Sequence, residues 1–263
     1  MSWDQRQRAM LAEMGFRLPE QAEAHEAPDV AGAVVVEAPA LVAVERAPAA
    51  APVPAPMAAR PPTPTPRAAA VVPTALAGLD LAALREAVLD GRACGACEHR
   101  VHLFGRGAQP QATWLVVTDP PDEADEGAGE LLGGDAGRLL DRMLAAVGQR
   151  VSGDGATAFV APIVPGRAPR GRPPLPQELE AGEAQLARLV ELLQPRLVLA
   201  MGLHAARRLS GSADPLGRLR GRVHLWRDLP VVVTYHPGYL LRNPADKAGA
   251  WDDLCLARKT FNT

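Results

Sequence analysis

The sequence has few of the features that mark secreted or membrane proteins. It contains three cysteines in 263 residues, too few for a framework of disulfide bonds. No apolar run approaches the length of a membrane span, and the N-terminus lacks the apolar core of a signal peptide. A formal net charge of -2 provides no overall attraction to nucleic acid. These absences predict a cytoplasmic protein.

Large apolar side chains and hydrophobic periodicity are also scarce between residues 18 and 78. Alanine and proline dominate there, as in residues 49–56 and 61–66. Such a segment cannot bury enough surface to fold, and its composition predicts an extended, semi-rigid tether. We therefore expect a short N-terminal segment at residues 1–17, a disordered linker at 18–78 and one folded domain at 79–263.

The N-terminal segment has the pattern of a short amphipathic helix. Ser2 is a suitable N-cap, and Gly15 is a suitable residue just past the helix end. The helix would place an apolar stripe on one face. The stripe could dock on the chain's own domain, but we favour insertion into the groove of a partner protein. The expected partner-binding residues are Trp3, Met10, Leu11, Met14 and Phe16.

The rest of the chain alternates short apolar runs with helical patterns. Strands are predicted at residues 114–117, 158–160, 197–200 and 231–233. Helices are predicted near 81–89, 136–147, 177–193, 204–209 and 244–257. Alternation of this kind predicts a parallel sheet covered on both faces. The expected fold class is α/β, a three-layer α/β/α domain around a central four-stranded parallel sheet.

Two polar residues directly follow predicted strands. Asp119 comes after the first strand, and His236 comes after the last strand on a Pro-Gly turn. Ligands of parallel sheets bind at the carboxyl ends of the strands. Asp119 and His236 are therefore the first candidates for chemistry.

The region from about Cys94 to Leu256 resembles the uracil-DNA glycosylase superfamily, most closely its iron-sulfur-containing bacterial type. Gly-Asp-Ala-Gly-Arg-Leu-Leu at residues 134–140, Leu-Arg-Gly at 219–221 and His-Pro-Gly-Tyr-Leu-Leu-Arg-Asn-Pro at 236–244 carry the resemblance. It implies that Asp119 stands in for the glutamate that positions water and that His236 polarises the base. Such enzymes act on a nucleotide flipped out of the DNA stack.

Other functional positions of that family differ here. The glycine that lets the backbone approach the ligand corresponds to Asp122, and the stacking phenylalanine to Leu132. The asparagine that reads uracil corresponds to Pro162, which has no side-chain donor or acceptor. Acidic residues also crowd the loop that would face DNA, where phosphates favour lysine and arginine. These differences favour a protein that keeps the glycosylase fold but has lost the catalytic activity. Asp119 and His236 would then be remnants of the former active site.

The iron-sulfur cluster implied by the resemblance lacks two of its ligands. Cys94 and Cys97 match the first pair, but the second pair falls at Gly166 and Gly182. A four-iron cluster needs four thiolates. The alternative is a zinc site formed by Cys94, Cys97, His99 and His102, although zinc ligands usually come as two separated pairs. We favour relic cysteines and expect no cofactor.

Both ends of the chain resemble the psi subunit family of bacterial DNA polymerase III. Ser-Trp-Asp-Gln at residues 2–5, Met-Gly-Phe at 14–16 and the Asn-Pro…Trp…Leu-Cys pattern at 243–255 carry this resemblance. It implies a non-catalytic replisome adaptor. The N-terminal helix would bind the collar of the clamp-loader tau/gamma ATPase. The domain would bind chi, which contacts single-stranded-DNA-binding protein, and direct DNA binding would be weak or absent.

Three functions therefore remain open. We favour the replisome adaptor, because a glycosylase needs no N-terminal arm. The second is a uracil-DNA glycosylase with a remodelled pocket acting in base-excision repair, with Asp119 activating water and His236 polarising the base. The third is a nucleic-acid-binding pseudoenzyme with another partner.

Overall fold

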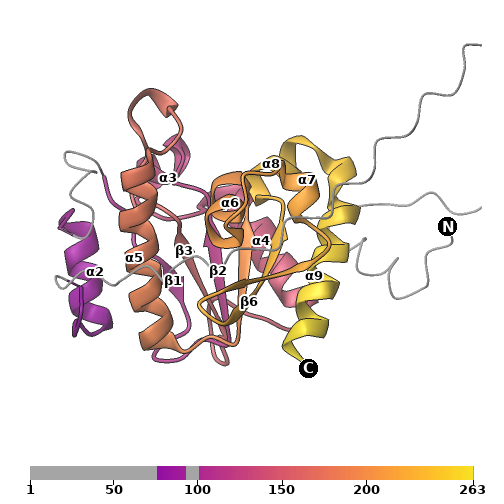
Figure 1. Cartoon of the computed structure of the whole chain (residues 1–263), viewed down its shortest axis with the longest axis horizontal. Helices are drawn as coiled ribbons and strands as arrows, with labels where there is room; N and C mark the ends of the chain where they lie inside the picture. The colour runs from indigo at the N-terminus through magenta and orange to yellow at the C-terminus, as the bar shows by residue number, and fades with distance from the viewer. Residues whose placement is uncertain (1–75, 93–100, 263) are drawn as a thin grey trace, which may run out of the picture.

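The computed structural model describes residues 76–92 and 101–262, and its core is a single sheet with strand order β1-β3-β2-β4-β6-β5 (Figure 1). The four inner strands run parallel to one another. They are β2 (Trp114–Thr118), β3 (Ala158–Pro162), β4 (Leu197–Met201) and β6 (Leu229–Thr234). Each contains one of the predicted strands, because strands covered on both faces appear in sequence as continuous apolar runs.

The prediction of a four-stranded parallel sheet is wrong at both edges. The short β1 (Arg106–Gly107) pairs antiparallel with β3, and β5 (Val223–Trp226) pairs antiparallel with β6, so the sheet is mixed and has six strands. β1 has only two residues and no hydrophobic pattern. The turn between β5 and β6 places Arg227 and Asp228 at φ values of 51° and 63°. Glycine or asparagine usually marks such a turn, so the sequence carried no hairpin signal.

The long helices lie where the sequence predicts them, and the short ones were missed. The predicted set is α2 (Leu81–Leu89), α4 (Gly134–Ala146), α5 (Pro176–Leu193), α6 (Leu203–Ser210) and α9 (Lys247–Phe261). The missed set is α3 (Glu123–Ala128), α7 (Leu216–Leu219), α8 (Pro237–Arg242) and the 3-10 turn Pro169–Gly171. The helix predicted from residue 244 begins as a 3-10 turn, Pro244–Asp246, and continues as α9. Elements of three to six residues are too short to show a period.

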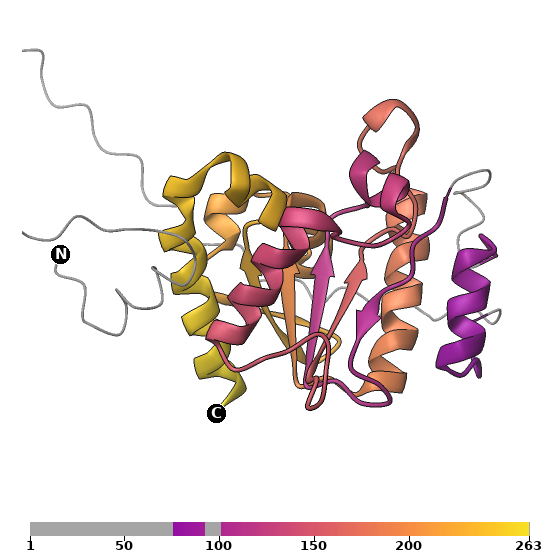
Figure 2. The same ribbon diagram turned by 180° about the vertical axis from the view of Figure 1, so that it is seen from behind.

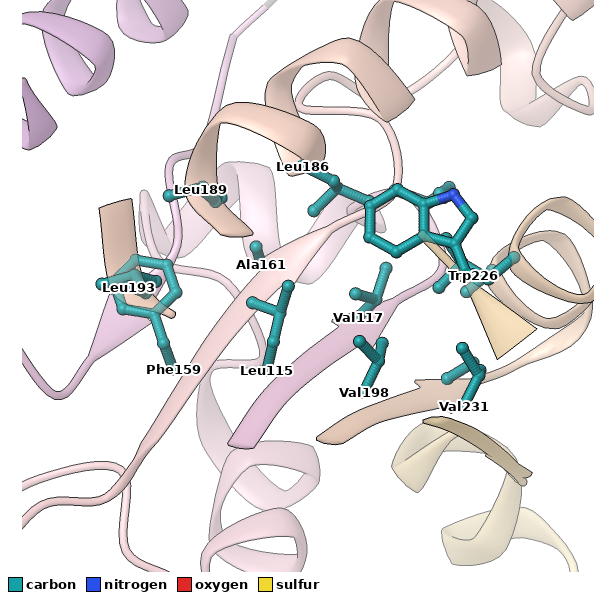
Figure 3. Packing of buried hydrophobic residues seen from close by; sticks show 14 of the residues in the cluster. Leu115, Val117, Phe159, Ala161, Leu186, Leu189, Leu193, Val198, Trp226 and Val231 are labelled. Atoms are coloured by element: carbon teal, nitrogen blue, oxygen red, sulfur yellow. The ribbon is translucent and has the colours of Figure 1, made fainter. Parts of the chain in front are cut away.

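Helices cover both faces of the sheet, so the three-layer prediction is confirmed (Figure 2). Helices α2, α5, α6 and α7 share one hydrophobic core with the sheet, and α4, α8 and α9 share the other. Alternate residues of β2 enter opposite cores. Figure 3 shows Leu115 and Val117 on the α5 side of the sheet, near Leu186.

Some predictions fall on residues that the structure does not describe. The N-terminal helix with Trp3, Met10, Leu11, Met14 and Phe16 lies outside the described residues, as does nearly all of the linker. Cys94, Cys97 and His99 also lie outside them. Within the described ranges, no helix is both long and apolar enough to cross a membrane.

Candidate active site

The carboxyl ends of the parallel strands bring the two predicted site residues to one edge of the sheet. Thr118 pairs with Met201, and Met201 pairs with Thr234, so β2, β4 and β6 end level with one another. Asp119 is the first residue after β2, and His236 is the second residue after β6. Helices α3, α6 and α8 lie along this end of the sheet, at the top of Figure 1. The sequence prediction of a shared edge is therefore confirmed.

The Asp119 carboxylate caps the N-terminus of helix α6. It accepts hydrogen bonds from the backbone amides of Leu203 at 3.0 Å, His204 at 2.8 Å and Ala205 at 3.0 Å. The first amides of a helix have no partner within the helix, and they favour a negative group. Asp119 thus supplies from another strand the cap that α6 lacks in its own sequence.

Gly202 makes this arrangement possible. It is the residue before α6, has a φ of 103°, and has no side chain to act as a cap. A Cβ at this position would lie 2.3 Å from Oδ2 of Asp119. Only glycine leaves room for the carboxylate against the helix, and only glycine adopts this φ without strain.

Capping leaves Asp119 little further hydrogen-bonding capacity. A carboxylate offers about four acceptor sites. Oδ1 accepts from two backbone amides and Oδ2 from one, so the remaining acceptor position is on Oδ2. The geometry permits one further donor, such as a single water molecule, in a direction set by the rigid helix end.

The ring of His236 is held in one tautomer by its own loop. His236 is the N-cap of α8, and its Nδ1 accepts a hydrogen bond from the backbone amide of Gly238 at 3.2 Å. A ring nitrogen that accepts carries no proton, so the neutral ring has its proton on Nε2. Burial lowers the pKa of His236 below 6.5, although Asp119, Asp125 and Asp122 oppose the shift. At neutral pH His236 is therefore a neutral donor through Nε2.

The acidic loop between β2 and α4 is organised by its own carboxylates. Asp122 and Asp125 form a reciprocal capping box at the start of α3, with hydrogen bonds of 3.0 and 3.3 Å. The buried Asp125 also accepts from the amide of Gly133 at 3.2 Å, and burial raises its pKa above 3.8. Arg167 pairs with Glu123 and Glu126, each at 3.3 Å, and so offsets part of the negative charge. Asp122, which the resemblance places at a glycine of the family, thus serves as a helix cap.

Leu132 and Pro162 cannot reproduce the base contacts of the family. Leu132 has a φ of 53° and is buried in the core that α4 shares with the sheet. A Cβ on Gly137 would lie 2.0 Å from the Leu132 carbonyl oxygen, so the loop passes directly against α4. Pro162 is buried at the end of β3. Neither residue offers an aromatic face or a side-chain hydrogen bond to a ligand.

The residues present do not fit a four-iron cluster. The whole sequence has three cysteines, fewer than the four thiolates required. A Cβ at Gly182 would lie 1.8 Å from the carbonyl oxygen of Ile163, so α5 packs there against backbone and has no room for a cysteine. Of the predicted zinc set, only His102 is described; it is buried and forms a β-bridge with Gly166. The described residues contain no group of three or more His, Cys, Asp or Glu that could hold a metal ion.

The sequence reasoning missed a second group of residues beside His236. Arg220 donates from Nε to Asp253 of α9 at 2.6 Å, and its guanidinium carbon lies 3.9 Å from the centre of the Tyr235 ring. Tyr235 directly precedes His236 in the chain. The matching Leu-Arg-Gly motif could have drawn attention to Arg220. Nothing in the sequence distinguishes Asp253 from its exposed neighbour Asp252.

Comparison with known proteins identifies the relatives of this chain. The family profile described as the uracil DNA glycosylase superfamily matches residues 104–255, more than half of the chain. A type-4 uracil-DNA glycosylase of Pyrobaculum aerophilum is 28% identical over 186 residues, which cover 68% of this chain and 93% of that protein. The type-4 uracil-DNA glycosylase of Sulfurisphaera tokodaii is 24% identical, over 61% of this chain and 76% of its own length. That of Saccharolobus solfataricus is 26% identical, over 65% of this chain and 83% of its own length.

These relatives contradict the favoured prediction of a replisome adaptor. The curated relatives are named as glycosylases, and they support the second of the three functions. The predicted clamp-loader, chi and single-stranded-DNA-binding protein partners, and the location at the replisome, are withdrawn with it. The adaptor prediction rested on the N-terminal arm, which lies outside the described residues, and on the changed pocket positions Asp122, Leu132 and Pro162. The geometry instead keeps Asp119 and His236 together at the sheet edge.

Proposed function

The chain belongs to the uracil-DNA glycosylase superfamily, and on that premise we propose that it is a DNA glycosylase with a remodelled pocket, acting on uracil or a related deaminated base in base-excision repair. The proposal is supported by the type-4 uracil-DNA glycosylases among its relatives. The observation that carries it is the position of His236 and the Asp119 carboxylate at the same edge of the sheet, with Nδ1 of His236 accepting from a backbone amide.

His236 has the properties of an electrophile toward a leaving base. As the bond between sugar and base breaks, negative charge develops on the carbonyl oxygen of the base. A neutral Nε2–H donor placed at that oxygen stabilises the charge most strongly in the transition state. The hydrogen bond of 3.2 Å from the Gly238 amide to Nδ1 holds the ring in the orientation that this role requires.

Asp119 has the properties of a group that positions water. The α6 amides hold its carboxylate rigidly, and their bonds leave one acceptor position on Oδ2 for a further donor. A water bound there would be oriented for attack on the anomeric carbon of the sugar once the base departs. The carboxylate would also stabilise the positive charge that develops on the sugar ring.

The remodelled pocket bears on base selectivity. A side-chain amide that reads the edge of uracil rejects bases with the wrong hydrogen-bonding pattern by large factors. Pro162 provides no such amide, and Leu132 provides no stacking ring. We therefore propose weak discrimination among deaminated bases that expose a carbonyl oxygen to His236.

The test is release of base from defined oligonucleotides. Single- and double-stranded DNA carrying one uracil or one hypoxanthine is incubated with the wild-type chain, with His236→Ala and with His224→Ala, and abasic sites are revealed by alkaline cleavage. His224 lies on the edge strand β5, and its ring forms a hydrogen bond with the carbonyl oxygen of Leu219 at 2.8 Å. It is the matched control because it is a histidine with a backbone partner that does not follow a parallel strand. We expect product with wild type and His224→Ala and a loss of at least about 100-fold with His236→Ala. No product from any substrate, or equal product from all three chains, would overturn the proposal.

A further inference from the structure

Arg220 and Asp253 form a buried ion pair next to the proposed active site. Their side chains are 15% and 1% exposed, and the Nε–Oδ2 distance is 2.6 Å. Removing two charges from water costs about as much as their attraction returns, so such a pair contributes little to net stability. The contacts that the pair makes with neighbouring side chains are therefore the better guide to its role.

The pair supports a stack of rings that leads to His236. The guanidinium of Arg220 lies over the ring of Tyr235 at 3.9 Å, and Tyr235 stacks on Tyr239 with ring centres 5.1 Å apart and planes 18° apart. The Tyr239 hydroxyl donates to Asp246 at 2.6 Å. Tyr235 and Tyr239 flank His236 in the chain by one and three residues. The stack thus restrains the loop on both sides of the imidazole.

Helix α9 is shaped to receive the guanidinium. Gly249 lies one turn before Asp253 on that helix, and a Cβ at Gly249 would lie 2.6 Å from Nη2 of Arg220. The end of an arginine side chain normally moves aside easily. Here Asp253 and Tyr235 hold it on two sides, so the absence of a side chain at Gly249 is part of the arrangement.

We propose that Arg220 and Asp253 are positioning residues, which hold Tyr235 and thereby orient the His236 imidazole for base excision. The inference rests on the proposed glycosylase function. Arg220 acts through a planar, stacked contact as well as a charge. Lysine can reproduce the charge but not the plane or the forked donors. Arg220→Lys is therefore the informative change.

The chain contains a matched control pair on the opposite face of the sheet. Arg208 of α6 pairs with Glu183 of α5, and their side chains are 13% and 4% exposed. Glu183 also accepts from the Trp226 indole at 3.0 Å, within the core of α5 and α6. Arg208→Lys disturbs a pair of the same kind and burial, whose partners lie in the core of α5 and α6 on the other face of the sheet from α8 and α9.

The experiment compares the two lysine variants by ring resonances of His236 in proton–carbon NMR and by single-turnover excision from uracil-containing DNA. We expect Arg220→Lys to shift the His236 signals and to lower the excision rate by about tenfold or more, since small misplacements of a catalytic group cost this much. DNA affinity should stay within about twofold, because the phosphate contacts that dominate DNA affinity are not altered. Arg208→Lys should leave both readouts at wild-type values.

Unchanged His236 signals in Arg220→Lys, or equal changes in both variants, would overturn the positioning role. A wild-type chain that releases no base would refute the glycosylase function. The NMR comparison would still decide whether Arg220 orients His236, so the two failures are distinguishable.

Discussion

The carboxylate of Asp119 accepts a hydrogen bond from the backbone amide of His204 at 2.8 Å. This contact joins the end of β2 to the first turn of α6 across a long stretch of sequence. It gives one residue two duties, because the proposed water-positioning group is also the cap of a helix. Loss of activity on changing Asp119 must therefore be separated from loss of stability.

Asp119→Ala should destabilise the protein and abolish base release. The variant leaves the first amides of α6 without their partner, and loss of such a cap costs about 1–2 kcal/mol. Asp119→Asn keeps an acceptor oxygen and should cost less stability while still losing activity. Urea unfolding and the oligonucleotide assay measure the two effects. Equal stability of wild type and Asp119→Ala would show that the cap is unimportant.

Gly202→Ala should cost more stability than the same change at a glycine that has a positive φ but open space around it. The added Cβ would meet the Asp119 carboxylate at 2.3 Å, at a φ of 103°. Gly148→Ala is the control, since Gly148 has a φ of 81° with nothing within 4 Å of its Cβ. A left-handed backbone alone costs about 1–2 kcal/mol. Gly202, at φ 103° and ψ 176°, is in a region that essentially only glycine adopts, so thermal unfolding should show a larger loss for Gly202→Ala, and the part due to the carboxylate should disappear in an Asp119→Ala background. An equal loss from Gly202→Ala in the wild-type and Asp119→Ala backgrounds would mean that the carboxylate moves aside freely.

His236 should titrate below pH 6.5, because burial lowers its pKa despite the three nearby carboxylates, and Arg242 adds to the lowering. The unfolded chain then binds more protons than the native state between the two pKa values. Stability should therefore rise with pH through this window and level off above 6.5. Excision should also fall as the pH drops through the native pKa. NMR titration measures that pKa, and a His236→Asn variant that keeps the same stability slope would contradict the assignment.

Gly249→Ala should destabilise the protein although it lies within a helix. Replacing glycine by alanine inside a helix normally stabilises it by about 1 kcal/mol. The clash with Arg220 at 2.6 Å should reverse this sign. Gly127→Ala in α3, where nothing lies within 4 Å, is the control and should stabilise. In an Arg220→Ala background the Gly249 change should also stabilise; if it does not, the clash is not the cause.

Pro162→Asn should sharpen selectivity for uracil over hypoxanthine. The asparagine amide supplies the donor and acceptor that the uracil-reading position of the family provides. A side chain that forms hydrogen bonds with the base can discriminate between bases by large factors. For an asparagine introduced into an otherwise unchanged pocket, we expect the uracil-to-hypoxanthine ratio to rise about tenfold. The ratio of excision rates on the two substrates measures this change. An unchanged ratio would place base reading elsewhere in the pocket.

The candidate site was only partly predictable. Asp119 and His236 were found because each follows an apolar run, and parallel strands end at the same edge of a sheet. The capping of α6 by Asp119 and the pairing of Arg220 with Asp253 were not found. Neither contact is local in sequence. Leu203 is 84 residues from Asp119, and Asp253 is 33 residues from Arg220. The adaptor prediction failed because it relied on the N-terminal arm and on the changes at Leu132 and Pro162, whereas the relatives of the folded domain are named as glycosylases.

The sequence by itself determined the four inner strands, the long helices and the edge of the sheet that carries Asp119 and His236. These follow from burial on both faces, which leaves continuous apolar runs and helical periods in the sequence. Only the tertiary structure decided the antiparallel edges β1 and β5, the tautomer of His236 and the partners of Asp119, Arg220 and Asp253. Those depend on which polar groups meet once the chain is folded. A pairing between distant residues leaves no period in the sequence.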